Sequence, residues 1–125
     1  MNISADLLPA IDTNFNAIPD CDTAKLNAVF HPQSSLFDAD KGAIFVEPID
    51  SFSKDVGSRV LPASMGQLPE AEILTMDFLS PLSATVKIRI RAHQSVFVDH
   101  LGFVLGDDGW KIASKIWHLE QTVEL

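Results

Sequence analysis

The stretch A-T-V-K-I-R-I-R-A-H, residues 84–93, alternates apolar and polar side chains without a break. Successive side chains of a β-strand point to opposite faces, so a period of two predicts a strand with one buried and one solvent-facing side. The apolar face consists of Ala84, Val86, Ile88, Ile90 and Ala92. The polar face consists of Thr85, Lys87, Arg89, Arg91 and His93. A slip of one residue would exchange the two faces, so the register is well specified.

Three further long strands are predicted around this one, at residues 70–79, 95–105 and 110–119. Short turn sequences, S-P-L-S and D-D-G among them, connect these strands, which is typical of an antiparallel meander. Two shorter strands are predicted at residues 34–38 and 43–47. The turn D-A-D-K-G joins them, and its glycine can take a positive φ angle.

The first third of the chain is predicted to be helical. One apolar stripe recurs every three or four residues and consists of Ile3, Leu7, Ile11, Phe15 and Ile18. Pro9 is comfortable only in the first turn of a helix, so we expect the N-cap at or near Asp6. Asp22 can cap a second, short helix that ends before His31-Pro32. A third helix is predicted over residues 48–56.

Composition predicts one globular domain over residues 1–125, with 46% hydrophobic and 21% charged residues. No apolar run approaches the roughly 20 residues that span a bilayer, and the first residues lack the features of a signal peptide. We therefore expect a soluble, cytoplasmic protein. A single cysteine rules out an internal disulfide, and the net charge of -8 argues against nucleic acid or anionic membranes as partners.

Helices first and a long meander later predict an α+β domain, in which helices pack on one face of a curved sheet. Such an arrangement leaves a pocket at its open end. Three phrases carry a family resemblance in their order and spacing: A-V-F-H-P at residues 28–32, V-F-V-D-H-L at 96–101 and D-G-W-K-I-A-S-K-I-W-H at 108–118. On these phrases the chain resembles small bacterial proteins of the putative lumazine-binding and SnoaL-like type, in the nuclear-transport-factor-2-like superfamily.

The resemblance covers nearly the whole chain and implies a cystatin-like cone. In such a cone, N-terminal helices pack on the concave face of a curved antiparallel sheet, and a pocket lies between them. It also implies a homodimer formed through the outer sheet face. The superfamily contains isomerases, dehydratases, cyclases and non-catalytic binding modules, so the fold alone does not choose a function.

Asp99 is the first candidate for catalysis. It interrupts V-F-V-D-H-L-G-F-V-L, where an ionised carboxylate is costly unless it is paired, hydrogen-bonded or open to a cavity. Desolvation would raise its pKa toward the range that suits a general acid or base. The structural alternative is a carboxylate bonded to a neighbouring strand or paired with a lysine at a dimer face.

His118 and His31 are the candidate partners of Asp99. Strict alternation from Trp110 would point His118 inward, where it could move a proton or orient the carboxylate. His31 could reach the pocket mouth, although F-H-P also makes sense as a helix stop. SnoaL-like cyclases use an aspartate with a histidine nearby. Ketosteroid isomerases and scytalone dehydratases use tyrosine hydroxyls, which this chain lacks.

Other side chains are candidates for holding a ligand. Phe15, Phe30, Phe97 and Trp110 are expected to line the cone, and Arg59 could pair with an anionic ligand or be solvated. No H-E-x-x-H, C-x-x-C or G-x-G-x-x-G motif occurs, so we predict neither a metal nor a nucleotide cofactor.

The polar face of the sheet is a candidate dimer interface. Its expected members are Lys87, Arg89, Arg91, Lys115 and Trp117. Exposed tryptophan between cations suggests a partner, and ion pairs to Asp77 or Glu72 across a two-fold axis would account for the charges. A bulge in the last strand would instead turn Lys115 and Trp117 into the pocket.

Three functions remain open from the sequence. The first is a dimeric, cofactor-free domain that binds a small, largely apolar molecule with Asp99 fixing its orientation. The second is an enzyme that performs isomerisation, cyclisation or dehydration with Asp99 as base and His118 or His31 as acid. The third is a protein-interaction module that uses the outer sheet face.

Overall fold

The computed structural model describes residues 3–17, 21–58, 70–92 and 94–123, so the expectations for Ile18, Arg59 and His93 lie outside the described residues. The helices and strands follow one another as α1 (Ile3–Ala17), α2 (Thr23–Val29), β1 (Phe30–Asp38), β2 (Phe45–Pro48), α3 (Ile49–Gly57), β3 (Glu70–Ser80), β4 (Ser83–Ala92), β5 (Ser95–Gly106) and β6 (Gly109–Thr122). None of the described helices is both long enough and apolar enough to cross a membrane.

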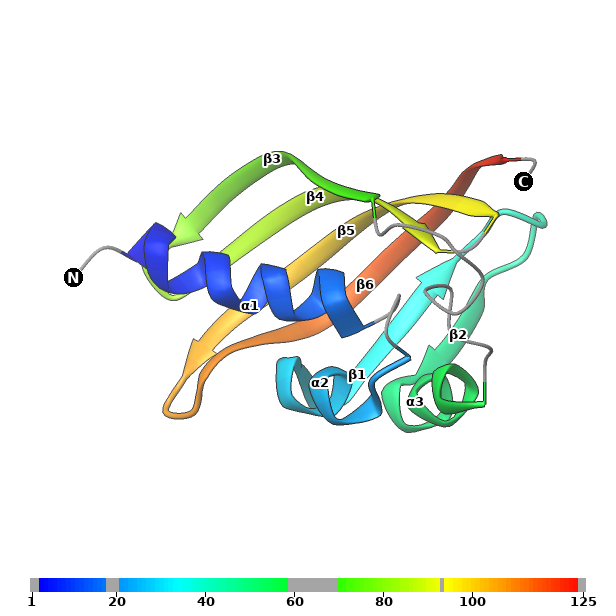
Figure 1. The fold of residues 1–125 in the computed structure, drawn as a ribbon. Helices are drawn as coiled ribbons and strands as arrows, with labels where there is room; N and C mark the ends of the chain where they lie inside the picture. The colour runs from blue at the N-terminus through cyan, green and yellow to red at the C-terminus, as the bar shows by residue number, and fades with distance from the viewer. Residues whose placement is uncertain (1–2, 18–20, 59–69, 93, 124–125) are drawn as a thin grey trace.

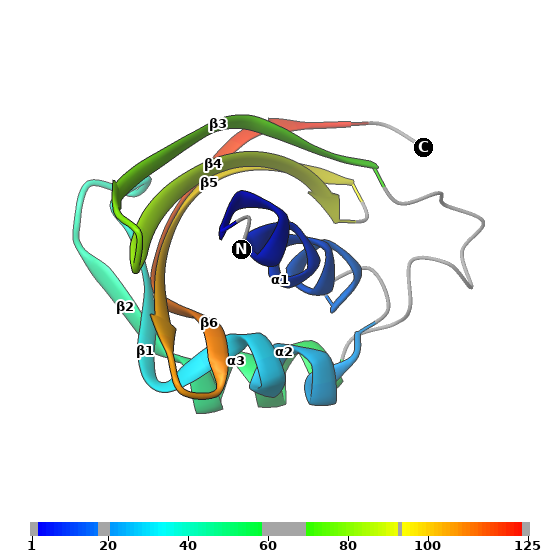
Figure 2. The same cartoon turned by 90° about the vertical axis from the view of Figure 1, so that its left-hand side faces the viewer.

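The strands form one six-stranded sheet in the order β2-β1-β6-β5-β4-β3 (Figure 1). Neighbouring strands are antiparallel except β1 and β6, which run parallel, so the sheet is mixed at that point. The sheet curves around α1, which lies in its concave face, while α2 and α3 lie side by side below α1 (Figure 2). The predicted α+β cone is confirmed.

The alternation in β4 decides which face of the sheet is buried. Val86, Ile88 and Ile90 are all within the core, as predicted. Opposite them, α1 contributes the buried side chains of Leu7 and Ile11. Burying each such side chain contributes roughly 1.5–3 kcal/mol, so the meander and α1 stabilise each other through one shared apolar core.

Local signals in the sequence place the ends of several elements. Asp22 caps α2 as predicted, and its carboxylate accepts a hydrogen bond of 3.1 Å from the backbone N–H of Lys25. Gly42 and Gly109 take the positive φ angles that their turns require. The expected start of α1 is wrong, because the helix begins at Ile3 and includes Pro9 in its interior. Packing of the apolar stripe against the sheet offsets the backbone hydrogen bond that proline cannot make.

An extra residue in β6 changes which side chains face the core. Gly102 of β5 pairs with Ser114, but the next residue of β5 pairs with Ile112, so Ala113 is inserted as a bulge. Beyond the bulge, Lys115 turns inward and is only 5% exposed, while Ile116 turns outward and is 55% exposed. The expectation from strict alternation, with Lys115 and Trp117 outside and Ile116 and His118 inside, is therefore wrong. The alternative with a bulge is the one observed.

We predict that Ile88→Ala lowers the free energy of unfolding by about 2–5 kcal/mol, because it leaves a cavity at a fully buried position of β4. The matched control is Ile44→Ala, since Ile44 is 80% exposed and its truncation should change stability by no more than about 0.5 kcal/mol. Urea unfolding followed by circular dichroism measures both. Equal losses in the two variants would contradict the assignment of β4 to the core.

Candidate functional site

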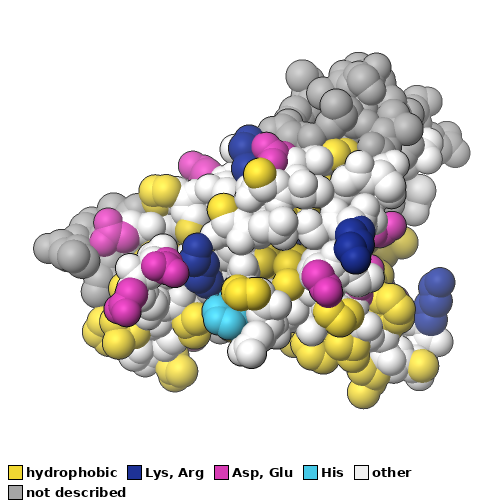
Figure 3. Space-filling view, turned by 90° about the horizontal axis from the view of Figure 1, so that it is seen from below, with side chains coloured by type: hydrophobic (Ala, Val, Ile, Leu, Met, Phe, Trp, Pro, Cys, Tyr) yellow, Lys and Arg dark blue, Asp and Glu magenta, His cyan; other side chains and the backbone are white. Residues whose placement is uncertain are grey.

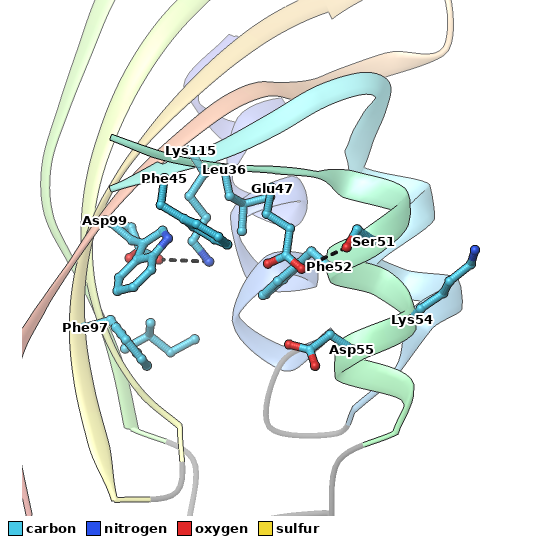
Figure 4. Close-up of a pocket in the computed structure, with 12 residues that line it drawn as sticks. Leu36, Phe45, Glu47, Ser51, Phe52, Lys54, Asp55, Phe97, Asp99 and Lys115 are labelled. Atoms are coloured by element: carbon cyan, nitrogen blue, oxygen red, sulfur yellow. Dashed lines mark hydrogen bonds and ion pairs between the residues drawn. The ribbon is translucent and has the colours of Figure 1, made fainter. Parts of the chain in front are cut away.

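A cavity of about 670 Å³ lies between the concave face of the sheet and α3. This volume is in the range typical of small-molecule sites. The lining side chains come from β1, β2, α3, β4, β5 and β6, and are Leu36, Phe45, Glu47, Ser51, Phe52, Lys54, Asp55, Ile90, Phe97, Asp99, Lys115 and Trp117. Figure 4 shows that apolar and aromatic groups lie around the buried Asp99 and Lys115, whereas the charged groups of β2 and α3 lie across the cavity from them.

The Asp99 carboxylate and the Lys115 ammonium form a buried ion pair on this cavity. Lys115 Nζ lies 3.4 Å from Asp99 Oδ2 (Figure 4), and the two side chains are 6% and 0% exposed. Asp99 projects from β5 and Lys115 from β6, with Trp117 directly opposite Asp99 in the ladder. Without the bulge at Ala113, Lys115 would point to the outer face and the carboxylate would be buried without this partner.

Burial raises the pKa of Asp99 above its ordinary value, because the low-dielectric surroundings disfavour the charged carboxylate. The positive charge of Lys115 opposes this effect without cancelling it. No group in the described part of the chain makes a well-formed hydrogen bond to either carboxylate oxygen, so the contact with Lys115 is mainly electrostatic. Asp99 is thus a carboxylate with unused hydrogen-bonding capacity.

Aromatic rings form much of the cavity wall. Phe97 and Trp117 pack edge to face, with centroids 5.5 Å apart and planes at 87°. Lys115 Nζ lies 5.2 Å from the centroid of the Phe52 ring, which is within range of a cation–π contact. These flat surfaces favour a flat, apolar ligand.

Acidic side chains predominate where β2 and α3 border the cavity. Glu47 and Asp55 point toward the cavity, and Lys54 points away from it (Figure 4). The hydroxyl of Ser51 donates a hydrogen bond of 3.1 Å to Glu47 Oε2. Glu47 therefore places a carboxylate across the cavity from Lys115 (Figure 4).

Neither of the predicted histidine partners joins Asp99. His118 lies outside the cavity with its side chain 66% exposed, and its Nδ1 lies 2.7 Å from Asp40 Oδ1. His31 lies at the start of β1, where its Nδ1 accepts a hydrogen bond of 3.0 Å from the backbone N–H of Gln33. The expected pairing of Asp99 with a histidine is wrong, because the bulge turns His118 outward and puts Lys115 in its place.

The predicted aromatic ligand contacts divide between the cavity and the core. Phe97 lines the cavity, whereas Phe30 and Trp110 are buried in the core cluster and Phe15 packs against that cluster. The ring of Trp110 contacts the Phe78 ring, with 6.2 Å between centroids. Phe30 and Trp110 therefore belong to the core and are not among the residues that line the cavity.

The cations of the outer sheet face have partners within the same chain. Arg89 binds Glu72 at 2.6 Å and Glu120 at 2.9 Å, and Arg91 Nη1 lies 3.7 Å from Glu70. The charges of Arg89 and Arg91 are therefore balanced within one chain and do not require a partner across a two-fold axis. Lys87 shares this outer face, whereas Lys115 and Trp117 do not.

Several cavity residues were missed by sequence reasoning. Glu47, Ser51 and Asp55 come from short elements whose position over the sheet no local pattern reveals. Gly102 did carry a usable signal, because a glycine inside a strand often marks a bulge or a close approach. A Cβ added there would lie 3.0 Å from Ser114 Oγ, next to the inserted Ala113.

No group of three or more His, Cys, Asp or Glu in the described ranges is placed to hold a metal ion. The groups that line the cavity are one ion pair, several aromatic rings and the charged side chains of β2 and α3. Such an arrangement can orient a small molecule, and a buried carboxylate with a raised pKa is also a candidate general acid or base.

The chain is similar to known proteins in sequence and in fold. The sequence model of a family described as putative lumazine-binding matches residues 4–118. None of the curated proteins matches the chain in sequence.

Solved structures match almost the full length of the chain. A nuclear-transport-factor-2-like protein of unknown function from Silicibacter pomeroyi is 19% identical with a TM-score of 0.80, over 96% of this chain and 100% of that one. One from Shewanella baltica, also of unknown function, is 16% identical with a TM-score of 0.84, over 95% and 94%. A ketosteroid isomerase-like protein from Erwinia carotovora is 13% identical with a TM-score of 0.71, over 94% and 95%. At these identities the likeness shows the fold.

We predict that Lys115→Met lowers the free energy of unfolding by about 3–5 kcal/mol at neutral pH, because it leaves the Asp99 carboxylate buried without a counter-charge. Loss of Lys115 raises the pKa of Asp99 further. A carboxyl group whose pKa is higher in the folded than in the unfolded protein stabilises the fold at low pH, and this contribution is lost as pH rises. The loss in free energy of unfolding caused by Lys115→Met should therefore grow from about pH 4 upward. Urea unfolding at several pH values measures it.

The control for this prediction is Lys41→Met, at an exposed position in the turn before β2. It should change stability little and without dependence on pH. In Asp99→Asn/Lys115→Met neither charge remains, so most of the loss should be recovered. A deficit in Lys115→Met that stays constant with pH would contradict the pairing.

Proposed function

The chain belongs to the putative lumazine-binding family, and we propose that it binds a small, largely apolar and aromatic molecule in the cavity, without a cofactor. The observation that carries the proposal is the buried Asp99–Lys115 pair at the aromatic wall of that cavity. The cavity supplies the apolar contact area, and the pair supplies the polar contact that orients the ligand.

The energetics of the pair support a role in binding. Two charges buried together cost several kcal/mol each in lost hydration, and apolar replacements of similar volume are often as stable or more stable. Here the pair lies against a cavity, and the carboxylate has no well-formed hydrogen bond within the described part of the chain. Perturbed charged groups on a cavity are typical of functional sites.

A second candidate is acid–base catalysis, favoured by the raised pKa of Asp99. In such a reaction the Asp99 carboxylate would take a proton from a carbon next to a carbonyl. The Lys115 ammonium would stabilise the enolate oxygen, and Asp99 would return the proton to another carbon. Lys115 would therefore be the partner of Asp99 in the reaction, a role for which the sequence suggested a histidine. Turnover of a ketone probe that Asp99→Asn abolishes without loss of binding would distinguish this candidate from simple binding.

We predict that prodan, an uncharged naphthyl ketone whose emission shifts to the blue in apolar surroundings, binds in the cavity. Excitation of tryptophan should then sensitise prodan emission. Trp117→Phe should remove most of this energy transfer, because Trp117 lines the cavity. Trp110→Phe is the matched control and should retain more of it, since Trp110 is in the core. Absence of any blue-shifted prodan emission would contradict a ligand-binding cavity.

We further propose that the protein is a homodimer formed through the outer sheet face. Apolar side chains gather at the lower right of Figure 3, over the end of the molecule that carries β2. On the outer face, exposed Val46 and Ile116 flank Phe37 in one cross-strand row. A two-fold axis would place this row against its copy, where apolar area is removed from water. The cytoplasmic location stays a prediction from the sequence.

We predict that Ile116→Glu converts the dimer to a monomer in native mass spectrometry, because it puts two carboxylates into an apolar contact across the two-fold axis. Prodan binding should persist, since Ile116 points away from the cavity. Leu79→Glu is the control at another exposed apolar site, on β3, and should leave the dimer intact. A wild-type protein that is monomeric at micromolar concentration would contradict the proposed interface.

A further inference from the structure

We infer that the cavity selects uncharged aromatic carbonyl compounds, such as aromatic amides, lactams and ketones, and rejects aromatic carboxylates, because Asp99 already balances the charge of Lys115. This inference rests on the proposed function and names the chemical class of its ligand. It follows from the exposure of the two charged groups, the balance of charge around the cavity, and the shape of the walls.

Lys115 is the polar group that a ligand meets first at the inner wall. Its side chain retains slight exposure, whereas Asp99 has none, so Lys115 is the more accessible of the two charged groups. An ammonium group has three N–H donors, and the Lys115 ammonium directs only part of this capacity toward Asp99 Oδ2 at 3.4 Å and the Phe52 ring at 5.2 Å. The remaining capacity suits an acceptor oxygen on the ligand.

The balance of charge opposes a negatively charged acceptor. Lys115 is the cation of the inner wall, and Asp99 already places one carboxylate beside it, while Glu47 points toward the cavity and Lys54 points away from it (Figure 4). A ligand carboxylate would lose its hydration and share one ammonium with Asp99, so two buried anions would repel each other at low dielectric. A neutral carbonyl oxygen accepts the same hydrogen bond without that repulsion.

The apolar and aromatic residues that line the cavity determine the shape of the rest of the ligand. Phe45, Phe97 and Trp117 present ring faces and edges to the cavity, and Leu36 and Ile90 complete an apolar lining. A flat ring system that carries its carbonyl at one end can pack against these rings while the oxygen reaches Lys115. Asp99 acts through Lys115 in this arrangement and is a positioning residue.

The test uses 2-naphthamide and 2-naphthoate, which share one ring system and differ in the charge of the carbonyl group. At neutral pH we expect the wild-type protein to bind the amide at least about tenfold more tightly, because like charges forced together in a desolvated site cost at least that much affinity. Quenching of Trp117 fluorescence gives both affinities, with Trp110→Phe as the background so that Trp117 is the remaining tryptophan.

Asp99→Asn supplies the decisive comparison. It keeps the size of the side chain and leaves Lys115 as an unbalanced cation, so the preference should reverse toward 2-naphthoate by about tenfold or more. The matched control is Asp77→Asn, at an exposed position on β3 that pairs with Thr85 on the outer face, and it should leave the ratio unchanged. In Asp99→Asn/Lys115→Met, where neither charge remains, 2-naphthoate should lose the affinity gained in the single variant.

Wild-type protein that binds 2-naphthoate as tightly as the amide would overturn the inference, as would a ratio that Asp99→Asn leaves unchanged. Either result would leave the proposed function intact, because a naphthyl ligand would still bind to the protein. Failure of all three probes would instead overturn the proposed function itself. Circular dichroism of each variant ensures that the comparison is made between folded proteins.

Discussion

The bulge at Ala113 is the constraint on which the site depends. It adds one residue to β6 beside Gly102, and the side chains of residues 114–119 change face, up to a second register shift between Leu119 and Gln121. Lys115 and Trp117 thereby enter the concave side, and Ile116 and His118 leave it. One inserted residue thus exchanges a histidine for a lysine next to Asp99 and puts a tryptophan in the cavity wall.

The ion pair then depends on the rest of the fold for its surroundings. The curved meander buries Asp99, α3 brings Phe52 within 5.2 Å of the Lys115 ammonium, and β2 adds Phe45 and Glu47 across the cavity. In low-dielectric surroundings a buried charge interacts strongly with a ligand that enters the cavity, so the pair can discriminate between ligands of different charge. Burying the same two charges is costly for the stability of the fold. The apolar core beneath α1 supplies the stability that this site does not.

The fold and the site depend on different features of the sequence. Full-length likeness to structures at 13–19% identity shows that the cone tolerates extensive change of sequence. The apolar faces of β4 and α1 are sufficient for that architecture, because packing requires volume and patterning more than particular residues. Function resides in the few polar groups that face the cavity, here an aspartate and a lysine from adjacent strands.

The sequence by itself determined the elements, because each depends on local chemistry. The period of two in residues 84–93, the cap at Asp22 and the turn at Gly42 all act over a few residues. The order of elements then predicted an α+β domain with helices on one face of a curved sheet, and the family resemblance implied the cone. Asp99 also stood out, as a charge in an apolar strand. Its partner and the cavity were decided only by the tertiary structure. A bulge is set by the pairing of β6 with both β1 and β5, and α3 meets the sheet through contacts distant in sequence, so neither leaves a periodic signal that alternation alone can detect.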